Sequence, residues 1–251
     1  MRTLVAVLAM LWCWCGLAQM PPRVMQDMQE AYASKPAAPA GGGQSPETIS
    51  GLAYRWKHTT LDTNVAVSSW VDSISGIILT NETVATRPTN TALGVQFSNA
   101  HMLSNSLPFF VTNFALWLSI KPTSANAYGA IIADEEGVTA SVIYQGAAVP
   151  LSVQVRGRDL TPAGAPLASG QRYDVLLSVS NLFAHVFTNG VLARTRDISE
   201  AQTYYLMYKM GQWSIAGYWE GYISEYCVWT NNFGIGTNAL GLHNYSTAIY
   251  Q

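Results

Sequence analysis

The chain is short of charged residues. Only 11% of its 251 residues are Asp, Glu, Lys or Arg, against about 25% in ordinary soluble domains. This scarcity excludes an acidic disordered chain and a coiled coil, because both need dense charge on their exposed positions. Basic residues are not in excess: thirteen Lys and Arg stand against fifteen Asp and Glu, for a formal net charge of −2. Counterion release therefore cannot drive nucleic-acid binding, and we expect no nucleic acid as a partner.

Cysteine is nearly absent as well. Cys13 and Cys15 lie in an apolar N-terminal run, and Cys227 lies inside a run of strand-forming residues. The one thiol outside the N-terminal run cannot form an intramolecular disulfide, so the domain must be stabilised by its core. We interpret Cys227 as a small buried hydrophobic residue.

The N-terminus has the pattern of a secretory signal peptide. Arg2 precedes an unbroken apolar run over 4–17, and about 14 residues are fewer than the roughly 20 that a membrane span needs. Gly16 and Ala18 supply the small residues of a cleavage site, so we predict a signal peptide over 1–18. Retention of this segment as an anchor is the alternative. After its removal we expect no transmembrane span, and an exported protein at an extracellular, cell-surface or periplasmic location.

The rest of the chain divides at about residue 50. Residues 19–50 are rich in Pro, Gly and Ala, including three consecutive glycines at 41–43, and this composition predicts a flexible linker. Residues 51–251 are long enough for one large domain. No internal repeat divides them.

Beyond residue 51 the hydrophobic pattern has mostly a period of two, which predicts β-strands. The expected strands are 110–120, 138–144, 151–155, 173–179, 183–187 and 221–230. Asn189-Gly190 predicts a tight hairpin turn. One helix is expected after Thr237 or Asn238, with apolar anchors Leu242, Tyr245 and Ile249. The predicted fold class is all-β: a two-sheet antiparallel jelly-roll sandwich with a short C-terminal helix.

Five segments, in this order, carry a family resemblance. They are Ser-Trp-Val-Asp-Ser-Ile-Ser-Gly at 69–76, an Arg-Pro element followed by Gly-Val-Gln-Phe within 87–97, the apolar run 114–122, Val-Phe-Thr-Asn-Gly at 186–190, and 217–229. Together they resemble laminin-G-like domains of the concanavalin A-like lectin/glucanase superfamily, of the bacterial and phage type. The resemblance implies a concanavalin A-like jelly roll that binds carbohydrate or another surface macromolecule. Ser224 departs from the family, which usually has Asp before the residue equivalent to Glu225.

The carboxylates do not form a catalytic pattern. Glucanases of this superfamily carry acids that alternate along one strand, which a retaining mechanism needs on one face about 5 Å apart. Asp134, Glu135 and Glu136 are consecutive, so a strand would point them to opposite faces; the better interpretation is a solvated turn closed by Gly137. Glu225 has no acidic residue two or four positions away, and we expect it to accept hydrogen bonds in a structural role. We therefore predict a non-catalytic protein.

Two sets of residues are candidates for binding. Flat aromatic rings on a β-sandwich can stack on sugars, and the densest aromatic run offers Tyr208, Trp213, Tyr218 and Trp219, although the same pattern also suits a core. If a metal is bound, Ca²⁺ is the expected ion, because it takes hard oxygen ligands. The candidate ligands are Asp72, Asn81 and Asn90.

Three functions follow in order of preference. The first is an exported, non-catalytic laminin-G-like module, a lectin or adhesion domain, whose partner is carbohydrate or a surface protein. The second is a structural or adhesive subunit of a surface layer, filament or fibre that self-associates through an apolar patch. The third is a glycan-active hydrolase, which would require two carboxylates facing one groove.

Overall fold

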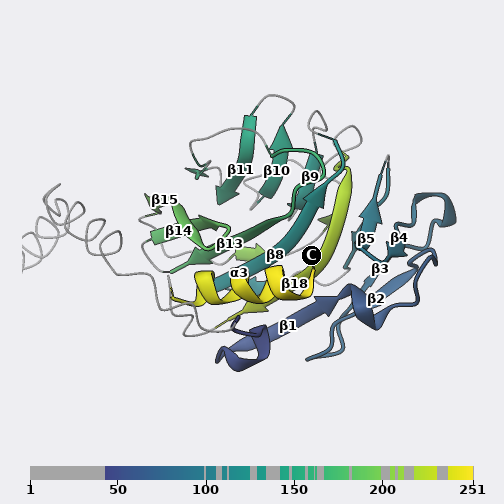
Figure 1. The fold of residues 1–251 in the computed structure, drawn as a ribbon, viewed down its shortest axis with the longest axis horizontal. Helices are drawn as coiled ribbons and strands as arrows, with labels where there is room; N and C mark the ends of the chain where they lie inside the picture. The colour runs from purple at the N-terminus through teal and green to yellow at the C-terminus, as the bar shows by residue number, and fades with distance from the viewer. Residues whose placement is uncertain are drawn as a thin grey trace, which may run out of the picture. The chain divides into compact units, whose positions relative to one another are not determined.

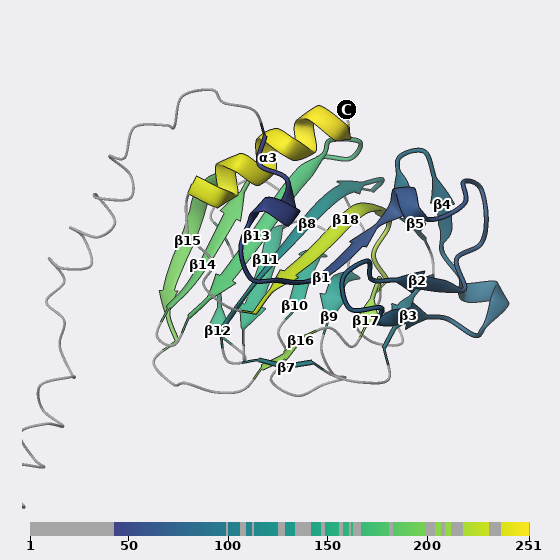
Figure 2. The same cartoon turned by 90° about the horizontal axis from the view of Figure 1, so that it is seen from below.

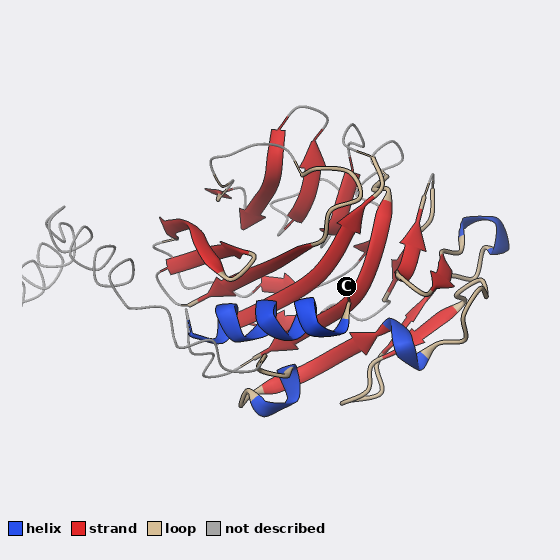
Figure 3. Ribbon diagram, viewed as in Figure 1, coloured by secondary structure: helices blue, strands red, loops and turns tan. Residues whose placement is uncertain are grey.

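The structure is a computed structural model, and it describes fifteen stretches of the chain. These are residues 43–98, 100–105, 109–111, 113–124, 129–133, 142–146, 149–155, 158–160, 162, 167–180, 183–198, 204–206, 209–211, 218–230 and 237–250. Within them the chain forms two large antiparallel β-sheets, a small two-stranded sheet and one α-helix (Figure 1, Figure 3). The predicted class, a two-sheet antiparallel jelly-roll sandwich with a C-terminal helix, is confirmed.

The first sheet has the strand order β15-β14-β13-β8-β18-β5-β4, and β1 also pairs with β18. Its strands are β1 (Leu52–Lys57), β4 (Thr89–Thr91), β5 (Gly94–Phe97), β8 (Phe114–Pro122), β13 (Tyr173–Val179), β14 (Phe183–Thr188), β15 (Val191–Asp197) and β18 (Gly221–Trp229). The long central strands β8 and β18 come from distant parts of the sequence.

The second sheet has the order β12-β11-β10-β9-β17-β6-β3-β2. Its strands are β2 (Ser69–Val71), β3 (Ile78–Thr80), β6 (Leu103–Ser104), β9 (Gly129–Ala133), β10 (Val142–Gly146), β11 (Val149–Val155), β12 (Arg158–Asp159) and β17 (Lys209–Met210). A separate two-stranded sheet pairs β7 (Phe109–Val111) with β16 (Tyr204–Leu206). Three short 3-10 helices, η1 (Pro46–Thr48), η2 (His58–Thr60) and η3 (Val84–Thr86), lie in the connections.

The main core lies between the two sheets, and strand alternation builds it. Along β8, Phe114, Leu116, Leu118 and Ile120 all belong to this core. The rings of Trp56 and Tyr226 stack inside it with centroids 5.4 Å apart. Burying aromatic and branched side chains of this kind provides most of the free energy of folding.

A second core forms on the opposite face of the first sheet, which we call the outer face. Side chains alternate along each strand of the first sheet, so every second residue points to the outer face. Trp117 on β8 and Leu176 on β13 are two of these residues. They are covered by the helix α3 (Thr237–Ile249), which contributes Leu242 and Tyr245 (Figure 1, Figure 2). The outer face is therefore apolar beneath α3.

Most predicted elements are present with small changes. The strands over 151–155, 173–179, 183–187 and 221–230 are β11, β13, β14 and β18. The strand expected over 110–120 is instead two strands, because the chain leaves the small sheet after β7 before it enters the first sheet as β8. Of the strand expected over 138–144, β10 begins at Val142, and 138–141 lie outside the described residues.

The helix anchors are partly as predicted. Leu242 and Tyr245 are buried, but Ile249 is 51% exposed. The buried side of the helix continues through Ser246 to Tyr250, a spacing of four, which turns Ile249 away from the sheet.

Part of the segment expected to be linker contacts the domain. The backbone N–H of Gln44 donates to the carbonyl of Gly241 at 2.9 Å, and the indole of Trp229 donates to the carbonyl of Ile49 at 3.3 Å. Ile49 is itself buried in the second core. The packed chain therefore begins before residue 51. Among the described residues, no helix is long and apolar enough to cross a membrane.

Candidate functional site

The four aromatic residues predicted to bind a ligand do not all lie in the described part of the chain. Tyr208 and Trp213 lie outside the described residues. Tyr218 is half-buried, and its backbone bridges to Ala130. Trp219 is fully buried in the main core, where its ring lies 6.1 Å from that of Phe97. The ring of Trp219 fills the core, and this position gives no support to its prediction as a sugar-binding residue.

Asp72, the first candidate calcium ligand, has both carboxylate oxygens occupied by protein donors. Oδ1 accepts from the backbone N–H of Arg55 at 2.5 Å and of Ile74 at 3.1 Å. Oδ2 accepts from the N–H and the hydroxyl of Ser75 at 2.6 and 2.5 Å. The side chain closes the turn between β2 and β3 and fastens it to β1. This turn explains the Asp and Ser of the 69–76 motif as structural residues.

Asn81 and Asn90 hold loops in the same manner. The Asn81 amide donates to the carbonyls of Thr86 and Met102, both at 2.8 Å. The Asn90 amide donates to the carbonyls of His58 and Leu61 at 3.2 and 3.0 Å.

The three candidate calcium ligands thus lie in separate hydrogen-bond networks. Among the described residues, no group of three or more His, Cys, Asp or Glu side chains is placed to hold a metal ion. This arrangement gives no support to Asp72, Asn81 and Asn90 as one calcium site.

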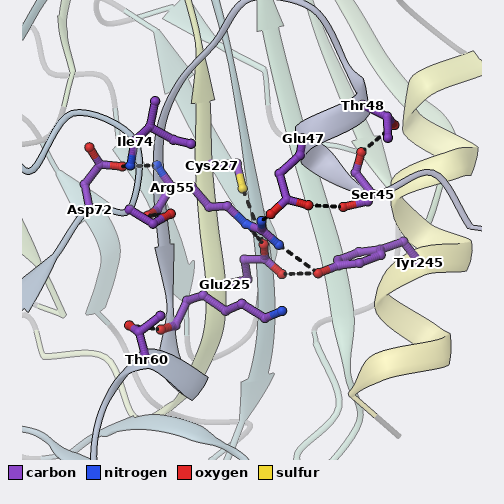
Figure 4. Close-up of polar contacts among 12 residues, drawn as sticks. Ser45, Glu47, Thr48, Arg55, Thr60, Asp72, Ile74, Glu225, Cys227 and Tyr245 are labelled. Atoms are coloured by element: carbon purple, nitrogen blue, oxygen red, sulfur yellow. Dashed lines mark hydrogen bonds and ion pairs between the residues drawn. The ribbon is translucent and has the colours of Figure 1, made fainter.

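A buried charged cluster lies on the outer face, at the C-terminal end of α3 (Figure 4). Glu225 on β18 is fully buried, and its Oε1 accepts from Nε of Arg55 on β1 at 2.5 Å. Arg55 also pairs with Glu47, on η1, and its Nη2 donates to the hydroxyl of Tyr245 at 3.0 Å. The sequence prediction that Glu225 accepts hydrogen bonds in a structural role agrees with these contacts.

Two tyrosine hydroxyls complete the shell of Glu225. Its Oε2 accepts from Tyr245 at 3.2 Å and from Tyr250 at 2.6 Å. Burial, together with the Glu225 charge, raises the pKa of Tyr245 to about 12 and raises that of Tyr250 further. Both phenols therefore stay protonated and act as donors. The lone pairs of Glu225 are taken up by the fold, so this carboxylate is not free to act as an acid or base.

Beyond the end of α3, the outer face carries a row of partly exposed polar and aromatic side chains. In the sheet register Tyr222 on β18 stands opposite Lys121 on β8 and Gln96 on β5. Residues opposite each other in antiparallel strands share a face and are direct neighbours. The next residues along, Ile223, Ile120 and Val95, point into the main core, so the row points outward. We call Lys121, Tyr222 and Gln96 the outer-face row.

Arg172 lies at one end of this row. It precedes β13, in which Tyr173 pairs with Ile120, and the N–H of Gly170 donates to the carbonyl of Pro122 at 2.8 Å. Because these contacts hold the chain on both sides of Arg172 against β8, Arg172 lies beside Lys121. Tyr173 packs against the main core, so Arg172 points to the outer face because side chains alternate along a strand.

Two histidines border the outer face, and their pKa values are shifted in opposite directions. His58 is buried, its ring lies 5.7 Å from that of Tyr250, and its Nδ1 has no hydrogen-bond partner among the described residues. Burial lowers the pKa of His58. His243 on α3 bonds through Nδ1 to Oδ2 of Asp174 at 2.7 Å, and this bond raises the pKa of His243.

The outer-face row was missed at the sequence level, although one signal for it was present. The alternation along 221–229 already separates Tyr222 from the core residue Ile223. No pattern in the sequence around Tyr222 shows that Lys121 and Gln96, about a hundred positions earlier, become neighbours of Tyr222. Strand pairing alone brings them together.

Comparisons with known proteins bear on the fold. No protein-family model matches the sequence, and no curated protein matches it either. A mutant of Trypanosoma rangeli sialidase displaying trans-sialidase activity is similar in structure, with a TM-score of 0.61 and 14% identity over 91% of this chain. The chain spans only 38% of that sialidase.

A second similar structure matches along its whole length. Domain 4 of AbnA, a GH43 extracellular arabinanase from Geobacillus stearothermophilus, solved in complex with arabinotriose, has a TM-score of 0.57 and 14% identity. The match covers 78% of this chain and 99% of that domain. At these identities the likenesses establish a shared jelly-roll β-sandwich fold.

Proposed function

We propose that the chain is an exported, non-catalytic carbohydrate-binding module that binds its ligand on the outer-face row. The observation that carries this proposal is the position of Tyr222. Its partly exposed ring lies between Lys121 and Gln96, one on each neighbouring strand. A flat apolar ring with hydrogen-bonding groups on both sides suits a sugar, whose ring face is apolar and whose edge carries hydroxyls.

Two further facts support a binding role over hydrolysis. Of the described carboxylates on this face, Asp174 and Glu225 are buried and bonded to His243 and Arg55, and Glu47 is paired with Arg55. A hydrolase needs two carboxylates free to reach a glycosidic bond. The second fact is that a structural neighbour covered to 99% of its length, domain 4 of AbnA, was solved with arabinotriose. That likeness supports the proposal that a β-sandwich of this fold can bind a saccharide.

The test is a glycan array with the full-length protein and two single variants. Tyr222→Ala removes the ring from the proposed site, and Tyr218→Ala removes a half-buried ring from the position predicted by sequence. We expect Tyr222→Ala to lower affinity about tenfold or more, as for a central aromatic contact, with Tyr218→Ala unchanged. Thermal unfolding of both variants shows that they are folded. A blank array for the wild-type protein, or binding that depends on Tyr218 instead, would overturn the proposal.

A structural role in a surface assembly is the competing function, and one observation favours it. Val71 and Ile78 are paired across the β2–β3 hairpin and are 46% and 45% exposed, with Ile74 exposed at the turn between them. Clustered apolar side chains on an edge hairpin are suited to contact a second copy of the chain. Sedimentation analysis of the wild type and of Ile78→Thr decides this point: concentration-dependent association that the variant abolishes would favour assembly.

A further inference from the structure

Arg172 is held rigidly at the border between the buried cluster and the outer-face row. Its Nη1 donates to the hydroxyls of Ser119 at 3.0 Å and Ser224 at 2.7 Å. The guanidinium carbon lies 5.3 Å from the centroid of the Tyr250 ring. Ser224 is fixed in turn, because its hydroxyl donates to the carbonyl of Leu93 at 2.8 Å. A long side chain fixed by so many neutral contacts has lost most of its rotamer freedom before any ligand binds.

The contacts that fix Arg172 in place are all with neutral groups. Among the described residues the ion pairs join Arg55 to Glu47 and Glu225, and His243 to Asp174, and none involves Arg172. Arg55, on the same face, shows the usual arrangement, in which a buried guanidinium is paired with carboxylates. Removing water from a half-buried cation is costly, and the nearby charge of Asp174, which acts to raise the pKa of Arg172, offsets this cost only in part. Burial accordingly lowers the pKa of Arg172.

The geometry leaves one edge of the guanidinium available. The hydrogen bonds of Arg172 within the described structure use Nη1 only, so Nε and Nη2 remain as a pair of parallel donors. This pair matches the two oxygens of a carboxylate. Lys121 lies beside Arg172 and adds a second cation on the same face, next to Tyr222.

We infer that Arg172 and Lys121 bind the carboxylate of an acidic sugar whose ring packs on Tyr222. This inference deepens the proposed function and rests on it. The ligand class is then a glycan containing a carboxylated sugar residue rather than a neutral one. Arg172 forms the bidentate contact, and Lys121 contributes a point charge that strengthens it.

The experiment uses the full-length protein on an array that contains uronic-acid, sialylated, sulfated and neutral glycans. The best carboxylated probe is then titrated by calorimetry beside its methyl ester, which keeps the sugar but removes the negative charge. We expect carboxylated glycans to be selected and the ester to bind at least tenfold more weakly. Each further tenfold loss corresponds to about 1.4 kcal/mol.

Three variants locate the contact. Arg172→Lys keeps the charge but loses the two-pronged geometry, and we expect a roughly tenfold to hundredfold loss of affinity. Lys121→Gln removes a partly exposed charge that forms none of the ion pairs among the described residues, so it tests the site without disturbing the serines. Arg194→Gln removes an exposed arginine from the edge strand β15 and serves as the control, with unchanged affinity expected.

The outcomes separate the two proposals. Neutral glycans that bind through Tyr222 with no effect of Arg172→Lys and Lys121→Gln overturn this inference and leave the proposed function standing. Selection of sulfated glycans alone also overturns it, because the carboxylate is then not the recognised group. A blank array overturns the inference together with the proposed function. Selection of carboxylated glycans that both variants weaken supports it.

Discussion

Arg55 on β1 and Glu225 on β18 form a buried ion pair, with Nε and Oε1 2.5 Å apart, although 170 positions separate them in the sequence. Arg55 also pairs with Glu47 on η1, and the hydroxyl of Tyr245 on α3 bonds to both Arg55 and Glu225. Four elements from both ends of the domain therefore meet at this ion pair. This arrangement makes the charge of Arg55 important for stability.

Arg55→Met should destabilise the protein strongly. The variant leaves the fully buried Glu225 without its counter-ion, and breaking a buried pair in this way costs about 3–5 kcal/mol. Urea unfolding measures the loss. Glu47→Gln is the matched control, because Glu47 is 58% exposed and an exposed partner contributes at most about 1 kcal/mol. Equal effects of the two variants would contradict this account.

The His243–Asp174 pair should make stability depend on pH. The bond to Asp174 raises the pKa of His243 above its ordinary value of 6.5, so the folded protein holds this proton more tightly than the unfolded chain. The contribution is therefore complete below pH 6.5 and is lost as the pH rises through the higher folded value.

We expect a loss on the order of 1 kcal/mol from this pair, measured as the urea midpoint between about pH 6 and pH 9. His243→Gln should remove that part of the slope. His185 provides a contrast, because burial lowers its pKa and its contribution has the opposite sign. A slope that persists unchanged in His243→Gln would show that another group is responsible.

The Asn189-Gly190 turn should tolerate a side chain at its second position poorly. Gly190 has φ +77°, and an added Cβ would lie 3.0 Å from Cα of Leu240 on α3. Gly170 has the same φ, with no atom within 4 Å of the added Cβ. Gly170→Ala should therefore cost only the left-handed backbone energy of about 1–2 kcal/mol.

Gly190→Ala should cost at least about 1 kcal/mol more than Gly170→Ala, because α3 must also shift. Thermal and urea unfolding of the two variants give this difference directly. If both glycines cost the same, the helix does not pack closely against the turn.

Cys227 should be inert in the folded protein. Its thiol is fully buried, and burial raises its pKa well above the ordinary value, so the reactive thiolate is not formed. We expect no alkylation of the peptide containing Cys227 after iodoacetamide treatment of the native protein, and complete alkylation in urea, as read by mass spectrometry. Rapid native labelling would place the thiol at the surface.

The sequence by itself determined the all-β class, the hairpin at Asn189-Gly190, the C-terminal helix and the burial of Cys227. These features depend on local patterns: a period of two, a turn that needs positive φ, and helical spacing. The sequence is sufficient to predict a feature when the residues that determine it lie close together in the chain.

Only the tertiary structure decided which side chains gather on one face. In the sequence, Trp219 suits either a sugar-binding surface or the core, and the structure buries it against Phe97. Asp72 reads as a metal ligand, but the backbone of Arg55 and the turn after β2 occupy its oxygens. Tyr222, Lys121 and Arg172 come together because three distant strands pair in register. Such pairing is set by the whole core, so no local pattern encodes it.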